Sequence, residues 1–175
     1  MPVVWLTGNS GAGKSAVCEL LKSRGELAVD ADWEGYSHFV DRTSGEVVTD
    51  PPYPVPAGWL DHFGWRSDRA KVEALAATAR DEVAFLCGSA ENEEEVRHLF
   101  DVVICLVIDE DTLRERLASR TGNAFGKHPE ELAAAVGANA GAEPAYRRLG
   151  AKIIDGRAPL PEVADAVLAA GRYED

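Results

Sequence analysis

The chain has 175 residues, of which 46% are hydrophobic and 27% are charged, and its 30 acidic against 18 basic residues give a formal net charge of −12. A chain of this size buries roughly two-thirds of the surface of its unfolded state, so it can form a globular domain without disulfide bonds. The excess of acid argues against a nucleic acid or an anionic membrane as the partner, because both are bound through clustered Lys and Arg. A local basic pocket for one nucleotide is compatible with the same charge.

Short, continuously hydrophobic runs alternate with helical patterns along the chain. The runs predicted as strands are 3–7, 27–30, 83–87, 102–108 and 151–154. The stretches predicted as helices are 14–24, 67–80, 112–120, 130–149 and 161–170. Strands without a polar face that alternate with helices are typical of a parallel sheet covered on both faces by helices. We therefore predict one α/β domain over residues 1–175, with a five-stranded parallel sheet in the middle of three layers.

Two irregular segments interrupt this alternation. Residues 36–65 contain four prolines, several glycines and an aromatic cluster of Trp59, Phe63 and Trp65. Residues 121–129, with the sequence TGNAFGKHP, follow a helix that is rich in arginine. Long irregular segments inside a compact α/β domain usually serve as lids or binding elements.

Two acidic segments are predicted to have structural roles. We interpret the run 91–95 as the solvated beginning of a helix, where acids interact favourably with the helix dipole. Asp109 or Asp111 is predicted to cap the helix that follows the fourth strand.

The most informative segment is 8–15, with the sequence GNSGAGKS, which matches the motif G-x-x-x-x-G-K-[ST]. It follows a predicted strand and precedes a predicted helix, the context in which this motif binds nucleotide phosphates. Its glycines let backbone N–H groups turn inward around phosphate oxygens at the helix N-terminus. We expect Lys14 to reach the β- and γ-phosphates of ATP and the Ser15 hydroxyl to bind Mg²⁺. The predicted nucleotide-binding residues here are Gly8, Gly11, Ala12, Gly13, Lys14, Ser15 and Ala16.

Three further motifs accompany this loop. The second predicted strand ends in Asp30-Ala31-Asp32, the helix 112–120 carries Arg116 and Arg120, and the last strand leads into the sequence IIDGRAP at 153–159. With the phosphate loop, these motifs resemble the P-loop kinases of the nucleoside-monophosphate-kinase-like group, in particular the shikimate and gluconate kinase branch. The resemblance covers nearly the full length and implies a P-loop NTPase fold. It also implies an ATP- and Mg²⁺-dependent kinase that phosphorylates a small hydroxyl-bearing acceptor, with an acceptor-binding insertion and a lid in the two irregular segments.

The resemblance assigns roles to individual side chains. It places Asp30 near the magnesium ion, and Asp32 at the acceptor hydroxyl, whose proton it would receive. Arg116 and Arg120 are four residues apart and share one helix face, from which they would approach the transferring phosphate with the lid. Arg157 would stack against the adenine ring.

The acceptor site is less well defined than the nucleotide site. We expect the acceptor to lie beneath Trp33, Trp65 and Arg66, and the resemblance implies a backbone amide contribution from Gly88. The third strand is followed by the sequence CGS at 87–89, however, where shikimate kinases have a glycine triplet. The chemical identity of the acceptor therefore stays open.

Other functions remain to be weighed against a metabolite kinase. A nucleoside-monophosphate kinase would need arginines on the acceptor phosphate, and Arg42, Arg66 and Arg69 are candidates. A regulatory ATP-binding protein without an acceptor is a second alternative, and a nucleic-acid end kinase is disfavoured by the acidic charge. A GTPase is disfavoured because the sequence N-K-x-D does not occur.

The compartment follows from the N-terminus and the cysteines. The first residues lack the basic segment of a secretory signal, and no run approaches the ~20 hydrophobic residues of a membrane span. The three cysteines are odd in number and far apart, as is typical of a reducing compartment. We therefore expect a cytoplasmic protein, either a monomer or a homodimer.

Overall fold

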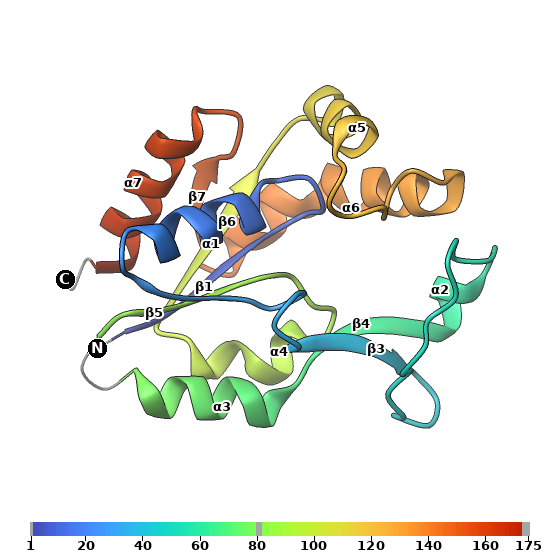
Figure 1. Ribbon diagram of the computed structural model, residues 1–175, viewed down its shortest axis with the longest axis horizontal. Coiled ribbons are helices and arrows are strands. Elements are labelled where there is room, and N and C mark those ends of the chain that lie inside the picture. Colours follow the sequence, from blue (N-terminus) through green and yellow to red (C-terminus); the bar gives the residue numbers. More distant parts are fainter. Residues whose placement is uncertain (1, 80–81, 173–175) are drawn as a thin grey trace.

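Five parallel strands form the central sheet, in the order β2-β5-β1-β6-β7 (Figure 1). The structure is a computed structural model that describes residues 2–79 and 82–172. The strands are β1 (Val3–Gly8), β2 (Leu27–Asp30), β5 (Ala84–Cys87), β6 (Val102–Val107) and β7 (Lys152–Asp155). All residues of β1 and β5 are buried, because helices cover both faces of the sheet, and this explains their uninterrupted hydrophobic sequences. The predicted parallel α/β sheet is confirmed.

Helices pack on both faces of the sheet (Figure 1). On one face lie α1 (Lys14–Ser23) and α7 (Leu160–Arg172), whose hydrophobic stripes pack on alternate residues of the central strands. On the other face lie α3 (Arg69–Thr78), α4 (Glu93–Val96) and the 3₁₀ turn η1 (Arg97–Leu99). The helix predicted over residues 67–80 ends at Arg80, which lies outside the described residues. Within the parts of the chain that the structure describes, no helix is long and hydrophobic enough to cross a membrane.

Two helices stand beside the carboxyl ends of the strands and carry the segment predicted as a lid between them. These helices are α5 (Glu110–Ser119) and α6 (Pro129–Arg148). Asp109 caps α5 by accepting a hydrogen bond from the Thr112 amide, as predicted. Phe125, from the lid segment, packs against Leu113 and Leu117 of α5 in a small core of its own, so this segment is folded onto the two helices.

The segment 36–65 is more regular than its composition indicated. It contains β3 (Ser37–Asp41) and the short helix α2 (Trp59–His62), and it leads into β4 (Phe63–Ser67). The strands β3 and β4 pair antiparallel as a separate two-stranded sheet, which extends from the main body (Figure 1). We missed this hairpin because the two strands are far apart along the chain and no tight turn joins them.

The acidic run 91–95 is only partly the solvated helix start that we predicted. Glu93, Glu94 and Glu95 do occupy the first turn of α4. Among the described residues, however, Glu93 Oε1 is buried without a hydrogen-bond partner, and burial raises the pKa of this carboxyl. Glu91 and Glu95 bond to arginines of the hairpin. The run therefore holds the hairpin against the main body.

Candidate functional site

The loop between β1 and α1 has the geometry of a phosphate-binding loop. Gly8, Gly11 and Gly13 have φ angles of 141°, 82° and 103°, which residues other than glycine rarely adopt. A Cβ atom at Gly8 would also lie 2.5 Å from the Leu106 carbonyl oxygen, so close strand packing requires glycine there. The loop ends at the N-terminus of α1, where unpaired N–H groups and the helix dipole favour an anion.

Lys14 folds back over this loop. Its Nζ atom donates hydrogen bonds to the carbonyl oxygens of Gly8 at 2.7 Å and Asn9 at 3.0 Å. Burial lowers the pKa of Lys14, and the nearby carboxylates of Asp32 and Asp30 oppose this effect. The ammonium group is therefore held at the loop by contacts for which a nucleotide phosphate can compete.

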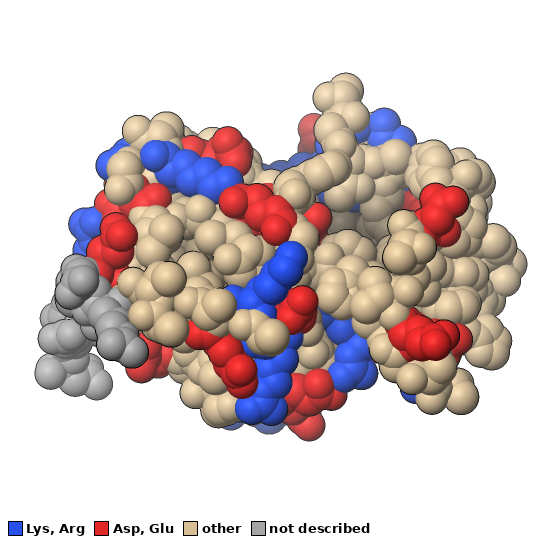
Figure 2. All heavy atoms as spheres, turned by 60° about the horizontal axis from the view of Figure 1, so that its bottom comes forward, with Lys and Arg blue, Asp and Glu red and all other residues tan. Residues whose placement is uncertain are grey.

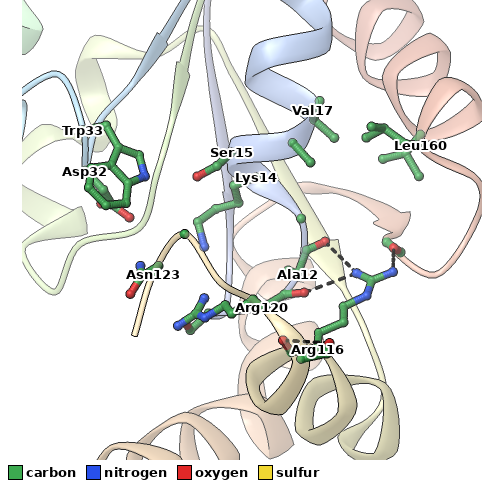
Figure 3. A pocket seen from close by; sticks show the side chains of 18 of the residues that line it. Ala12, Lys14, Ser15, Val17, Asp32, Trp33, Arg116, Arg120, Asn123 and Leu160 are labelled. Atoms are coloured by element: carbon green, nitrogen blue, oxygen red, sulfur yellow. Dashed lines mark hydrogen bonds between the residues drawn. The ribbon is translucent and has the colours of Figure 1, made fainter. Parts of the chain in front are cut away.

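A cavity of about 580 Å³ opens in front of the loop (Figure 3). The Lys14 ammonium, the Ser15 hydroxyl and the Asp32 carboxylate face the same space in this view. The remaining walls come from several separate segments. Its lining includes Trp33, Arg116, Ser119, Arg120, Gly122, Asn123, Gly156, Ala158, Leu160 and Val163.

The two aspartates after β2 have different surroundings. Asp30 is buried, and its Oδ1 atom accepts hydrogen bonds from the amides of Asp32 at 3.0 Å and Trp33 at 3.2 Å. Asp32 extends into the cavity, where its Oδ1 atom accepts a hydrogen bond from Trp65 Nε1 at 3.0 Å. Burial raises the pKa of Asp32, while Lys14 and the Trp65 hydrogen bond act in the opposite direction. Asp30 thus shapes the turn, whereas Asp32 faces the cavity with a raised pKa, and its role as a proton acceptor stays a prediction.

The two predicted lid arginines make different contacts. Arg116 donates to the carbonyl oxygens of Gly11 at 3.2 Å, Ala12 at 3.4 Å and Gly156 at 2.8 Å, and so joins the phosphate loop to the end of β7. Arg120 donates to Ser10 Oγ at 3.3 Å and to the carbonyl oxygen of Phe125 in the lid. Both side chains line the cavity, but their contact with a transferring phosphate stays a prediction.

Arg120 has capacity for a further hydrogen bond. Its Nε atom is buried without a partner among the described residues. Burial lowers the pKa of Arg120, and the carboxylates of Glu131 and Asp32 counteract this effect. A guanidinium that is desolvated and incompletely bonded at a cavity wall is suited to an anionic ligand.

Arg157 is not among the residues that line the cavity. Its guanidinium bonds to Asp109 at 2.8 Å and to Asp155 at 2.8 Å, and its side chain is 52% exposed. The adjacent cavity wall is formed by Gly156, Ala158 and Leu160. We missed these wall residues because small and hydrophobic side chains carry no distinctive motif. Stacking of Arg157 on a base therefore stays a prediction.

Of the four predicted acceptor contacts, one lines the cavity. Trp33 lines it and is 65% exposed, whereas Trp65 is not a lining residue and donates a hydrogen bond to Asp32, which is one. Arg66 instead pairs with Glu95. The Gly88 amide donates to the Leu6 carbonyl oxygen at 3.0 Å, and its carbonyl accepts from Trp5 Nε1 at 2.8 Å. The backbone of Gly88 is thus already hydrogen-bonded within the main body.

The lid segment is anchored by a buried acid. The acidic pair Glu130–Glu131 in the sequence predicts solvated side chains, and this prediction is wrong for Glu131. Glu131 is 1% exposed, and its Oε2 atom accepts a hydrogen bond from the Gly126 amide at 2.8 Å. His128, at the end of the lid, contacts Tyr53 of the insertion edge-to-face, with ring centroids 5.5 Å apart. The lid and the insertion therefore meet at this ring contact.

Solved structures of three kinases are similar to the chain over nearly its whole length. A gluconokinase from Sinorhizobium meliloti is 20% identical, with a TM-score of 0.53, over 97% of this chain and 90% of that one. A sugar kinase from a Janibacter species is 17% identical, with a TM-score of 0.57, over 97% and 94% of the two chains. The shikimate kinase from Acinetobacter baumannii is 16% identical, with a TM-score of 0.57, over 99% and 96%. At these identities the likeness shows the fold, which is the predicted fold of the P-loop kinases.

No protein family model matches the chain, and no curated protein is similar to it in sequence.

Proposed function

We propose that the protein is an ATP-dependent phosphotransferase that transfers the γ-phosphate to a hydroxyl group of a small acceptor. The observation that carries the proposal is the position of Asp32 in the same cavity as Lys14 and the phosphate loop. A carboxylate with a raised pKa, placed opposite the groups that hold the phosphates, suits a reaction in which positioning is the main requirement.

In the proposed transfer, the side chains of the cavity have distinct roles. The acceptor hydroxyl lies at Asp32, which orients it and accepts its proton. The acceptor oxygen forms a bond to the γ-phosphorus while the bond from that phosphorus to the β–γ bridging oxygen breaks, and ADP leaves with the electron pair. Lys14 and Arg120 hold the negative charge on the phosphate oxygens. The lid excludes water, which would otherwise compete with the acceptor.

The cavity also offers the oxygen ligands that Mg²⁺ prefers. The Ser15 hydroxyl faces the cavity and is a direct ligand in this proposal, whereas Asp30 Oδ1 already accepts two amide hydrogen bonds and would act through water. Among residues 2–79 and 82–172, no cluster of three His, Cys, Asp or Glu residues could hold a metal alone. In the proposed complex the nucleotide phosphates supply further oxygen ligands to the ion. When bound, it supplies neutralisation of charge on the β- and γ-phosphate oxygens.

The competing function is an ATP-binding regulatory protein without an acceptor. The kinase is favoured because Asp32 is held by Trp65, a residue of the hairpin that is separate from the nucleotide loop. A protein that only binds ATP does not require a second structural element, the hairpin, to position this carboxylate.

The decisive experiment measures ADP release from ATP and Mg²⁺ in the presence of hydroxyl-bearing metabolites and nucleosides, followed by the mass of the product. We expect stimulation by at least one compound and a product heavier by one phosphoryl group. ADP release that no compound stimulates would favour the regulatory alternative.

A further inference from the structure

The hairpin beside Asp32 has two chemically different faces. Its register pairs Phe39 with Trp65, and the next pair on one side joins His38 with Arg66. Because side chains alternate along a strand, cross-strand pairs share a face and neighbouring pairs point to opposite faces. The hydrogen bond from Trp65 to Asp32 identifies the face of Phe39 and Trp65 as the one turned toward the cavity.

Aromatic rings cover this face, which adjoins the cavity at Asp32, although none of these rings is among the residues that line the cavity itself. Phe39 contacts Trp65 and Trp59 edge-to-face, with both centroid distances at 4.8 Å. Trp59 in turn stacks on Phe63 at 4.3 Å. The four rings form a continuous wall, which we call the aromatic wall (Phe39, Trp59, Phe63 and Trp65). Aromatic ring faces carry negative electrostatic potential and attract cations.

The arginines of the hairpin occupy the opposite face. Arg42 bonds to both carboxylate oxygens of Glu91, at 3.3 Å and 2.6 Å, and Arg66 pairs with Glu95. A Cβ atom at Gly64 would lie 1.7 Å from Glu91 Oε1, so this carboxylate covers the side of the hairpin that Gly64 shares with Val40. Both guanidinium groups are therefore neutralised on the side away from the aromatic wall.

Other basic groups near the hairpin are also bonded elsewhere. Arg69 pairs with Glu73 at 2.8 Å, and Lys71 Nζ donates to the Gly35 carbonyl oxygen at 2.6 Å. The segment 36–67 contains four acidic and two basic residues. Figure 2 shows mostly uncharged side chains, with acidic ones among them, over the part of the molecule that carries the hairpin and α2.

These contacts bear on the charge of the acceptor. Recognition of a carboxylate or phosphate needs a positioned Arg or Lys, because an anion that leaves water without a partner is strongly destabilised. The cationic side chains of the cavity, Lys14, Arg116 and Arg120, lie at the phosphate loop and the lid. The acceptor side instead offers the aromatic wall and the Asp32 carboxylate.

We propose that the acceptor carries no carboxylate or phosphate group, and that a hydroxyl compound with an amine is preferred over its neutral counterpart. The hydroxyl lies at Asp32, and the ammonium group lies against the aromatic wall. This inference rests on the proposed kinase function and narrows the class of its substrate. It also excludes a nucleoside monophosphate as the acceptor.

The test compares acceptors that share a carbon skeleton and differ in charge. Glucosamine, glucose, gluconate and glucose 6-phosphate form one such set, and matched amino alcohols, diols, hydroxy acids and nucleoside–nucleotide pairs extend it. ADP release and product mass are measured for each compound. We expect kcat/KM for the best amine-bearing compound to exceed that of its carboxylate and phosphate counterparts by about tenfold or more, which corresponds to one well-placed charge interaction.

Two variants test the position of the charge. Trp59→Arg adds a cation to the aromatic wall and is expected to reduce turnover of the amine and to raise that of the carboxylate. His38→Arg adds the same charge on the opposite face and is expected to leave the order of preference unchanged. Equal changes of preference in both variants would contradict the assignment of the faces.

The outcomes separate this inference from the function on which it rests. If a carboxylate or phosphate compound is the best acceptor of the wild-type protein, the charge assignment is overturned while the kinase function stands. If none of the hydroxyl compounds stimulates ADP release, the result favours the regulatory alternative over the kinase function, and this inference is overturned with the kinase function.

Discussion

The two sides of the cavity are built in different ways. The nucleotide side is a run of consecutive residues, 8–15, which joins a buried strand to a helix and is shaped by glycines. The acceptor side is assembled from β3 and β4, which are separated by residues 42–62, and is held to the main body by Trp65 and by Glu91 and Glu95. The proposed phosphate site thus depends on the local backbone, whereas the proposed acceptor site depends on which side chains the register of two distant strands turns inward.

The largest effect is expected on the nucleotide side. Lys14→Ala should reduce phosphoryl transfer by about 10³-fold or more, because it removes the ammonium group that holds the transferring phosphate. The variant should remain folded by circular dichroism. Arg24→Ala removes a cation at the other end of α1, where Arg24 pairs with Asp165, and is the matched control. Normal turnover by the Lys14 variant would refute the kinase function.

The carboxylate between the two sides is the next test. Asp32→Asn should lower kcat by about 10²- to 10⁴-fold, because the amide cannot accept the acceptor proton. The Kd for ATP, measured by fluorescence or calorimetry, should change little. If the variant instead loses ATP binding and keeps its kcat at saturation, Asp32 belongs to the metal site and not to proton transfer.

A smaller effect is expected from the residue that joins the hairpin to Asp32. Burial raises the pKa of Asp32, and the Trp65 hydrogen bond favours the charged form. Turnover requires that charged form, so kcat should fall as the pH decreases through the raised pKa. Trp65→Phe removes the hydrogen bond, raises this pKa further and should move the acidic limb of the pH profile of kcat to higher pH. Trp59→Phe should leave the limb in place, whatever its effect on KM.

The smallest effects are expected from glycines, one on each side. In Gly8→Ala the new Cβ meets a backbone carbonyl oxygen at 2.5 Å with φ at 141°, so we expect a loss of about 2–4 kcal/mol in the free energy of unfolding. In Gly64→Ala the new atom meets the flexible end of Glu91, which can move, so we expect a loss of about 1 kcal/mol. Denaturant titration measures both. A larger loss for Gly64→Ala would mean that the hairpin is as rigidly held as the main body.

Much of the fold could be predicted from the sequence. Strands buried on both faces need continuous hydrophobic runs, so the runs at 3–7 and 83–87 coincide with β1 and β5 to within about one residue. The phosphate loop was equally predictable, because its glycines are required by backbone conformations with positive φ angles. The role of the acidic run 91–95 was harder to predict, because a charged sequence does not indicate whether its side chains contact water or the arginines of a distant hairpin.

By itself, the sequence determined the α/β sheet, the phosphate loop and the acidic pair at its edge, because each depends on residues that are neighbours in the chain. Only the tertiary structure decided which of these residues act together. It brought Trp65 to Asp32, turned Arg42 and Arg66 away from the cavity and paired them with acids. The physical reason is that strand pairing between 37–41 and 63–67 sets which side chains face inward, and that register depends on long-range packing that hydrophobic periodicity within either strand does not encode.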